Sequence, residues 1–454
     1  MAHSEQDGGD LVGWTKRPRA QKLSWALFDW AQQPYVTLVA AFLFKPYFSS
    51  GYLADPVRGQ TLLGIGGGLA AAFVAVLTPI LGAAIDRRGD AKLWIAIGST
   101  LFVGACCGLW LADPAHPERA YLILGFIVLA AVTAEVTTTA NNTMLPFVAH
   151  PSKIGSLSGR GVAIGYAGGL AALGIYLAGF TFADPPLFGL DKAAKEPERF
   201  VGPFVAAWYL LFVLPMFLWT PTRPATATRR ETAGLRSLLS LLKRRPDATR
   251  FLIGRMLVAD GLSAAGVFGG VLAAGLFDWG MAELGAYGVL TVTLSGVGAW
   301  AAGRLDDRCG PKTTVMAAVC VLALAVAGVG CVTANRLFFA IPLSPPTPGD
   351  GFLASAGERI FMALGLLIGL SAGPLQTSLR AWMAQLAEPE EEGRWFGLFA
   401  LANRATAFAG PLAIAALTAL LHEQRIAIAV ILTFLVAGAL VLRRTPAARL
   451  SAGG

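Results

Sequence analysis

The sequence predicts an all-α membrane protein, with twelve transmembrane helices in two six-helix bundles related by pseudo-symmetry. The first observation is composition: 55% of the residues are hydrophobic and 14% are charged, with a mean hydropathy of +0.60, whereas soluble domains carry about 25% charged residues. The second is a series of twelve apolar stretches, each near the roughly 20 residues that a helix needs to cross a bilayer. The third is a short charged motif that occurs twice, half a chain apart.

The twelve candidate spans are separated by polar or charged loops, and their even number places both chain ends on one side of the membrane. In chain order they are 23–44, 61–83, 93–112, 120–144, 160–181, 203–219, 251–275, 284–303, 313–333, 354–379, 395–420 and 426–442. We expect five parts along the chain, which are an N-terminal tail at 1–22, a first bundle at 23–219, a linker at 220–250, a second bundle at 251–442 and a C-terminal tail at 443–454.

The repeated motif reads G-x-x-x-D-R-x-G followed by lysine, and each copy lies between two apolar stretches. The first copy contains Gly82, Asp86, Arg87, Gly89 and Lys92, and the second contains Gly303, Asp307, Arg308, Gly310 and Lys312. The motif resembles the loop between the second and third helices of major facilitator transporters, which recurs between the eighth and ninth. We expect the glycines, aspartates and arginines to form a cytoplasmic gate, in which acid and base pair across the two halves in one state and separate in the other.

Basic residues are concentrated in the loops on one side of the membrane. The formal net charge is +8, and basic residues concentrate in both tails, in the two motif loops and in the linker, whereas loops 184–200 and 276–283 are mixed or acidic. The positive-inside rule therefore predicts that both termini are cytoplasmic. Within the linker, four leucines recur at helical spacing (Leu235, Leu238, Leu239 and Leu242), which predicts a short amphipathic helix on the anionic inner leaflet, with an unstructured linker as the alternative.

Several other classes of protein are disfavoured by the residues. The five cysteines and four histidines lack metal-ligand spacing, so we expect no metal and no disulfide framework. No phosphate-binding G-x-x-x-x-G-K-S/T loop and no basic patch with interleaved aromatics occurs, so we expect no cofactor and no nucleic acid. The polar start of the chain lacks a signal-peptide core, and we interpret the first apolar segment as a retained span. We expect no enzymatic activity, and transport driven by a gradient rather than by ATP.

Polar residues inside the spans are candidates for a substrate or proton pathway, because a charge at mid-bilayer costs about 2.5–3.5 kcal/mol on insertion scales. They are Asp29, Gln33, Glu135, Asn142, Arg160, Asp260, Gln376, Arg380 and Arg404. We expect Asp260 and Glu135 to line a central cavity, with Arg160 or Arg404 as counter-charge for a substrate carboxylate. Structural ion pairs within the helix bundle, or snorkelling of the arginines near helix ends, are the alternative.

Several segments resemble a more specific family. Trp25–Ala31 reads W-A-L-F-D-W-A, similar to the W-A-x-Y-D-W-A opening of the vacuolar amino-acid effluxers linked to autophagy and of their bacterial relatives. Further similar segments are Asn142–Pro146, Ser158–Gly169, Asp260–Gly261, Gln376–Arg380, Phe396–Leu398 and Gly410–Pro411. The sequence departs from the family at Gln32–Pro34 and at Arg404, where lysine is common, so the resemblance implies transport without carrying over the substrate.

These observations predict a secondary active transporter in the bacterial inner membrane that acts as a monomer by alternating access. It would move a small organic solute, with amino-acid efflux as the first expectation, protons as the coupling ion and uniport as the fallback. A proton-linked drug or metabolite exporter is the alternative within transport, and it would favour a more aromatic, less charged cavity. A receptor or scaffold that has lost transport is the alternative from another class, and the two intact motif loops argue against it.

Overall fold

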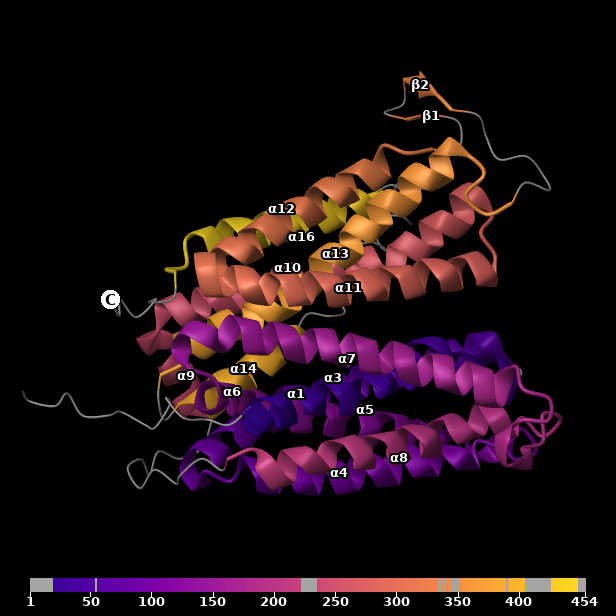
Figure 1. The fold of residues 1–454 in the computed structure, drawn as a ribbon, viewed down its shortest axis with the longest axis horizontal. Helices are drawn as coiled ribbons and strands as arrows, with labels where there is room; N and C mark the ends of the chain where they lie inside the picture. Colours follow the sequence, from indigo (N-terminus) through magenta and orange to yellow (C-terminus); the bar gives the residue numbers. More distant parts are fainter. Residues whose placement is uncertain are drawn as a thin grey trace, which may run out of the picture.

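The structure is a computed structural model that describes residues 19–53, 55–221, 235–333, 336–337, 340–343, 351–388, 391–404 and 426–447. Its long helices run roughly side by side along the long axis of the molecule, in two groups (Figure 1). The group coloured indigo to magenta is the N-terminal half, and the group coloured pink to yellow is the C-terminal half.

The N-terminal half is built from six long helical segments. These are α1 (Arg19–Pro34) continued by the π-helix η2 (Tyr35–Phe42), α3 (Pro56–Arg88), α4 (Ala91–Gly108), α5 (Ala120–Thr143), α7 (Ile154–Tyr176) continued by η7 (Leu177–Thr181), and α8 (Glu196–Trp219). Short helical turns join them, namely α2 (Phe44–Pro46), η3 (Tyr47–Tyr52), η4 (Leu109–Leu111), η5 (Pro117–Arg119), α6 (Leu145–Val148), η6 (Pro151–Lys153) and η8 (Leu187–Gly189).

The C-terminal half begins after the short linker helix α9 (Leu235–Arg244). It contains α10 (Pro246–Phe277), α11 (Met281–Cys309), α12 (Pro311–Gly330), α13 (Ala356–Leu386), α14 (Glu392–Arg404) and α16 (Ile426–Arg443). Between α12 and α13 lies a small antiparallel pair, β1 (Arg336–Leu337) and β2 (Ile341–Pro342). The expected eleventh span, 395–420, is described only as far as Arg404, and residues 405–420 lie outside the described part.

Helices coincide with the predicted spans, and nine of those described are long and apolar enough to cross a membrane. Two boundaries differ in a way that matters for the site: α7 begins at Ile154 rather than at 160, and α13 continues to Leu386 rather than ending at 379. Hydropathy marks where apolar residues stop, whereas a helix continues as long as its backbone hydrogen bonds and packing are maintained. Ser158 and Arg380 therefore lie inside helices.

The last glycine of each motif copy ends a helix. Gly89 follows α3 with φ of 71°, and Gly310 follows α11 with φ of 81°. Glycine adopts such positive φ values without the steric cost that a side chain imposes. At the second copy Pro311 then occupies the first position of α12, where its missing N–H is not needed.

The first span changes geometry at its proline. Pro34 is the last residue of α1, and the chain continues as the π-helix η2. Proline lacks the N–H that would bond to the carbonyl one turn earlier, and its ring crowds that carbonyl. The first span therefore changes helix type locally at Pro34.

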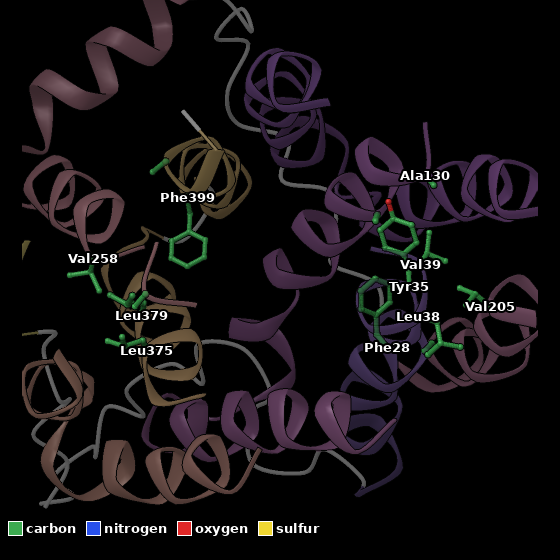
Figure 2. Packing of buried hydrophobic residues seen from close by; sticks show 14 of the residues in the cluster. Phe28, Tyr35, Leu38, Val39, Ala130, Val205, Val258, Leu375, Leu379 and Phe399 are labelled. Atoms are coloured by element: carbon green, nitrogen blue, oxygen red, sulfur yellow. The ribbon is translucent and has the colours of Figure 1, made fainter. Parts of the chain in front are cut away.

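Apolar packing fills the interior of each half. Figure 2 shows the labelled core residues in two groups, one with Phe28, Tyr35 and Leu38 and the other with Leu375, Leu379 and Phe399. The first group comes from the N-terminal half and the second from the C-terminal half. Large rings such as Phe28, which is fully buried, fill the space between neighbouring helices.

Both motif loops lie at the same end of the two halves, which we call the motif end. Helices α3 and α11 finish there, and α7 and α14 begin there. In Figure 1 it is the left end, where the described chain also has its two termini. The polar contacts between the halves described below lie at or near this end.

Candidate functional site

A buried arginine joins the two halves near the motif end. Arg380 on α13 is 6% exposed, and its Nη1 lies 3.1 Å from Oδ2 of Asp29 on α1. Its Nε donates to the hydroxyl of Ser158 on α7 at 2.9 Å, and its Nη2 donates to the Ser158 carbonyl at 2.8 Å. A longer bond of 3.4 Å reaches Oδ1 of Asn142 on α5. We call these four residues the charge cluster.

The planar guanidinium suits this arrangement, because its fixed fork of donors serves several acceptors at once. Three of its partners belong to the N-terminal half and come from three different helices. The cluster is reinforced by Ser158, whose hydroxyl also donates to the backbone carbonyl of Thr377 on α13 at 2.9 Å. Trp25 lies against it, with Arg380 Cζ 5.0 Å from the indole centroid, and donates its Nε1–H to the Asn141 carbonyl at 2.9 Å.

A glycine makes room for the ion pair. A Cβ added at Gly161 on α7 would lie 2.6 Å from Asp29 Oδ2 and 3.1 Å from Arg380 Nη2. Both groups are held in place by the bonds described above. Absence of a side chain at this position therefore permits the contact between the halves.

A second polar contact crosses between the halves. The side-chain amide of Gln376, one turn before Arg380 on α13, donates to the hydroxyl of Tyr166 on α7 at 2.9 Å. Gln33 lies one turn after Asp29 on α1, is half-buried, and faces α7 where a Cβ at Gly169 would be 2.9 Å from its Cγ. The structure thus brings Asp29, Gln33 and Gln376 to the surfaces where the halves meet.

The first motif copy holds the start of a helix in the opposite half. Asp86 is 8% exposed, and its two carboxylate oxygens accept the backbone N–H groups of Gly393 at 2.7 Å and Arg394 at 2.9 Å. These amides belong to the first turn of α14, where N–H groups have no partner within the helix and a negative charge is favoured. The backbones approach closely, since a Cβ at Gly82 would lie 2.0 Å from the Gly393 carbonyl oxygen.

The second copy makes the same contact in the reverse direction. Asp307 Oδ1 accepts the backbone N–H of Ser156 in the first turn of α7 at 3.1 Å, and its Oδ2 lies 3.4 Å from Lys153 Nζ. A Cβ at Gly303 would lie 2.7 Å from the Gly155 carbonyl oxygen. Each half therefore caps a helix of the other with its motif aspartate, and each first glycine permits the close approach.

The motif arginines behave differently from the expected acid–base pairs. Arg87 is exposed, and its Nε donates to the Ala83 carbonyl on its own helix at 3.3 Å. Arg308 is also exposed. Both motif carboxylates accept backbone N–H groups from the first turn of a helix in the opposite half.

Comparison with known proteins agrees with this architecture. A family model described as "Vacuole effluxer Atg22 like" matches residues 62–450, which include both motif copies. The chain belongs to this family. It is 22% identical over 441 residues to the "Uncharacterized MFS-type transporter YxiO" of Bacillus subtilis (strain 168), covering 95% of this chain and 96% of that protein. It is 24% identical over 343 residues to "Autophagy-related protein 22" of Yarrowia lipolytica, and these residues cover 68% of this chain and about half of that longer protein.

Solved structures show the fold of this Atg22-like protein. The major facilitator superfamily transporter FucP, in the outward conformation, aligns with a TM-score of 0.69 at 12% identity, over 94% of this chain and 98% of FucP. A bacterial homologue of the iron transporter ferroportin, in the outward-facing state, aligns with a TM-score of 0.67 at 14% identity, over 94% and 98%. The predicted twelve-helix, two-bundle fold is thereby confirmed, and the Atg22-like chain is a multi-pass membrane transporter of this superfamily rather than an enzyme.

The other predicted pathway residues of the Atg22-like chain lie on α5, α7, α10 and α14. Asp260 is buried in α10 and Glu135 is half-buried in α5. Arg160 is exposed on α7, and no acidic side chain contacts it among the described residues, which favours the snorkelling interpretation. Arg404 is the last residue of α14, which packs against α10, and its side chain lies outside the described part. Arg380 is a cation that the structure places beside a pathway acid, Asp29.

Sequence reasoning missed three members of the site. Ser158 and Trp25 stand in segments that resemble the family, yet serine and tryptophan carry no signal of charge to be neutralised. Tyr166 was likewise not selected as a site residue. The glycines around them were the available signal, since Gly161 and Gly165 lie on one face of α7, where an added Cβ would be 2.6 Å from Asp29 Oδ2 and 3.2 Å from Asp29 Cβ, respectively.

Proposed function

We propose that this Atg22-like protein is a secondary active transporter that exports a small organic solute, with an amino acid as the first candidate, by alternating access. The observation that carries the proposal is the Asp29–Arg380 pair, which joins a carboxylate of one half to a guanidinium of the other at 3.1 Å. A zwitterionic solute offers both charges in one molecule, so it can satisfy the two groups when they separate. The description of the family as vacuole effluxers supports the direction of transport.

We propose that the motif end faces the cytoplasm. The motif loops, like the tails and the linker, are basic, and the positive-inside rule places basic segments in the cytoplasm. In bacteria this orientation belongs to the inner membrane. The state described here would then be closed toward the cytoplasm by the charge cluster and by the two helix caps. Opening toward the cytoplasm would break these contacts and expose the polar side chains to solute.

Proton coupling is the mode of energy supply that we propose. Asp29 pairs with Arg380 only while the halves are together, and separation changes the balance of charge around the carboxyl group. A movement that separates buried charges can be driven by a gradient of a cation, and the proton is the cation that we propose. Uniport remains the alternative that the same experiment tests.

The decisive experiment uses the purified protein in liposomes with a panel of radiolabelled amino acids, with and without a pH gradient. We expect saturable movement of one or more amino acids that accelerates with the gradient. Transport of an amino acid at a rate independent of the pH gradient would indicate uniport. Absence of transport for every amino acid tested would refute the substrate assignment.

Variants of the two motif aspartates test the gate in the same liposomes. Asp86→Asn and Asp307→Asn each remove the negative charge from a helix N-terminus of the opposite half while keeping the size of the side chain. We expect both to slow transport and to leave membrane insertion unchanged. Wild-type rates in both variants would contradict a role of these residues in gating.

A further inference from the structure

One buried carboxyl group takes no part in the contacts described above. Asp306 immediately precedes the motif aspartate on α11 and is 2% exposed. Its Oδ1 accepts a hydrogen bond of 2.8 Å from the hydroxyl of Ser378 on α13, whereas its Oδ2 has no hydrogen-bond partner among the described residues. The group lies where the two halves touch, because a Cβ at Gly155 on α7 would be 2.4 Å from the Asp306 Cβ.

The positive charges that the described residues place around Asp306 are bound to other groups or exposed. Lys153, just before α7, pairs with Asp307 at 3.4 Å. Arg380 on α13 is bound within the charge cluster. Lys312 on α12 donates to two backbone carbonyls at the end of α16, at 2.9 and 2.6 Å. Arg304 and Arg308, on the same helix as Asp306, are exposed.

Burial and the adjacent charge favour a neutral carboxyl group at Asp306, whereas the two hydroxyl groups beside it favour the ionised form. Asp307 is the adjacent charge and has the same sign. Asp307 accepts the N–H of Ser156 in the first turn of α7, and among the described residues that helix end donates no hydrogen bond to Asp306. The hydroxyl groups of Ser378 and Thr314 lie beside it, and a hydroxyl can donate to a carboxylate or accept from a carboxylic acid. A buried carboxylate without a cation is costly, and protonation removes that cost.

We infer that Asp306 is a proton-binding site that links closure of the cytoplasmic side to cytoplasmic pH. Separation of α7 from α11 brings water to the carboxyl group, which then ionises and releases its proton to the cytoplasm. Closure buries the group again and takes up one proton. Because the closed state binds more protons than the open state, a lower cytoplasmic pH favours the closed state.

The inference rests on the proposed function only for the cytoplasmic orientation of the motif end. It needs neither an amino acid as substrate nor a proton as the driving ion. The proton at Asp306 enters and leaves on the same side of the membrane. The site therefore acts as a pH sensor of the gate.

The test measures conformation without substrate and without a gradient. Spin labels at Ser152 and Thr313, exposed residues at the motif ends of the two halves, report separation by double electron–electron resonance in the full chain in nanodiscs, with the native cysteines replaced. In the otherwise unchanged protein we expect the open fraction to grow with pH, up to the limit of about tenfold per pH unit that one proton allows. Asp306→Asn is neutral at every pH, so we expect a mainly closed protein without this slope.

The control Asp184→Asn changes an exposed acid at the opposite end, and we expect it to keep the slope. A wild-type slope in Asp306→Asn, or an open protein at every pH, would overturn the inference. If the Asn variant does not fold, Ser378→Ala replaces it. Loss of the hydroxyl that stabilises the ionised form should move the midpoint of the open fraction to higher pH. An unchanged or lower midpoint would overturn the inference. If the open fraction depends on pH but no amino acid is transported, only the proposed substrate is refuted. If an amino acid is transported but the open fraction does not depend on pH, only the role of Asp306 as a pH sensor is refuted.

Discussion

Replacement of Arg380 by lysine tests whether the charge cluster holds the motif end closed. Lysine keeps the positive charge beside Asp29, so the pair itself can persist. It cannot reproduce the fork that bonds the hydroxyl and the carbonyl of Ser158 at 2.9 and 2.8 Å. These bonds exist only while the halves are together, because Ser158 and Arg380 lie on α7 and α13 of different halves.

The size of the effect follows from the bonds that are lost. A hydrogen bond to a charged group contributes about 1.5–3 kcal/mol. Loss of two such bonds therefore disfavours the closed state by about 3 kcal/mol or more. Since about 1.4 kcal/mol corresponds to a factor of ten, we expect the open fraction of Arg380→Lys to rise by roughly a hundredfold from its low starting value.

Alkylation of a buried cysteine measures this change. Thr377 is fully buried beside the cluster, and Thr377→Cys in a cysteine-free background introduces a thiol that reacts only when the halves separate. We expect alkylation to accelerate by roughly the same factor in Arg380→Lys. Arg199→Lys is the matched control, because this buried arginine bonds to Trp110 and Asp113 within the N-terminal half alone. An alkylation rate within twofold of the parent in Arg380→Lys would refute the reasoning.

Three further outcomes are expected from the described residues. Gly161→Ala places a Cβ 2.6 Å from a carboxylate oxygen of the charge cluster, so it should accelerate the same alkylation, whereas Gly125→Ala, where a Cβ meets nothing within 4 Å, should not. Asp260→Asn should abolish the pH dependence of uptake in liposomes if this buried acid carries a proton, whereas a packing role predicts a lower yield and earlier thermal unfolding. Single cysteines at Thr228 and Ala194 test the topology: an impermeant thiol reagent on intact cells should label position 194 and spare position 228, and the reverse pattern would invert the protein.

Much of the helical architecture could be predicted because a membrane restricts the conformations that the backbone can adopt. In a bilayer the backbone must satisfy its own hydrogen bonds, so an apolar stretch of sufficient length is a helix. The spans, the duplicated motif and the proline at position 34 were therefore visible in the sequence. The helix ends were less certain, and the extensions of α7 and α13 beyond their apolar stretches carry Ser158 and Arg380 into the site.

Part of the candidate site was also visible, since charges in apolar spans stand out. Asp29, Asn142 and Arg380 were all selected from the sequence, and the structure brings them together. Their pairing could not be predicted, because Asp29 and Arg380 are 351 positions apart in the chain. Arg160 offered an equally suitable charge, and only the packing of α1, α7 and α13 distinguishes Arg380 from it.

The sequence by itself determined the membrane class, the helical segments and the two-fold repeat, because hydropathy, periodicity and motif spacing are local properties of a chain. It also supplied a glycine at the end of each motif copy, and the backbone adopts positive φ values at both, Gly89 and Gly310. The tertiary structure alone decided that each motif aspartate caps a helix of the opposite half, and that Asp306 is buried beside Ser378 while its neighbour Asp307 binds a backbone amide. Adjacent residues on a helix point in different directions, so whether a carboxylate meets a helix N-terminus, an arginine or a hydroxyl depends on how the two halves pack.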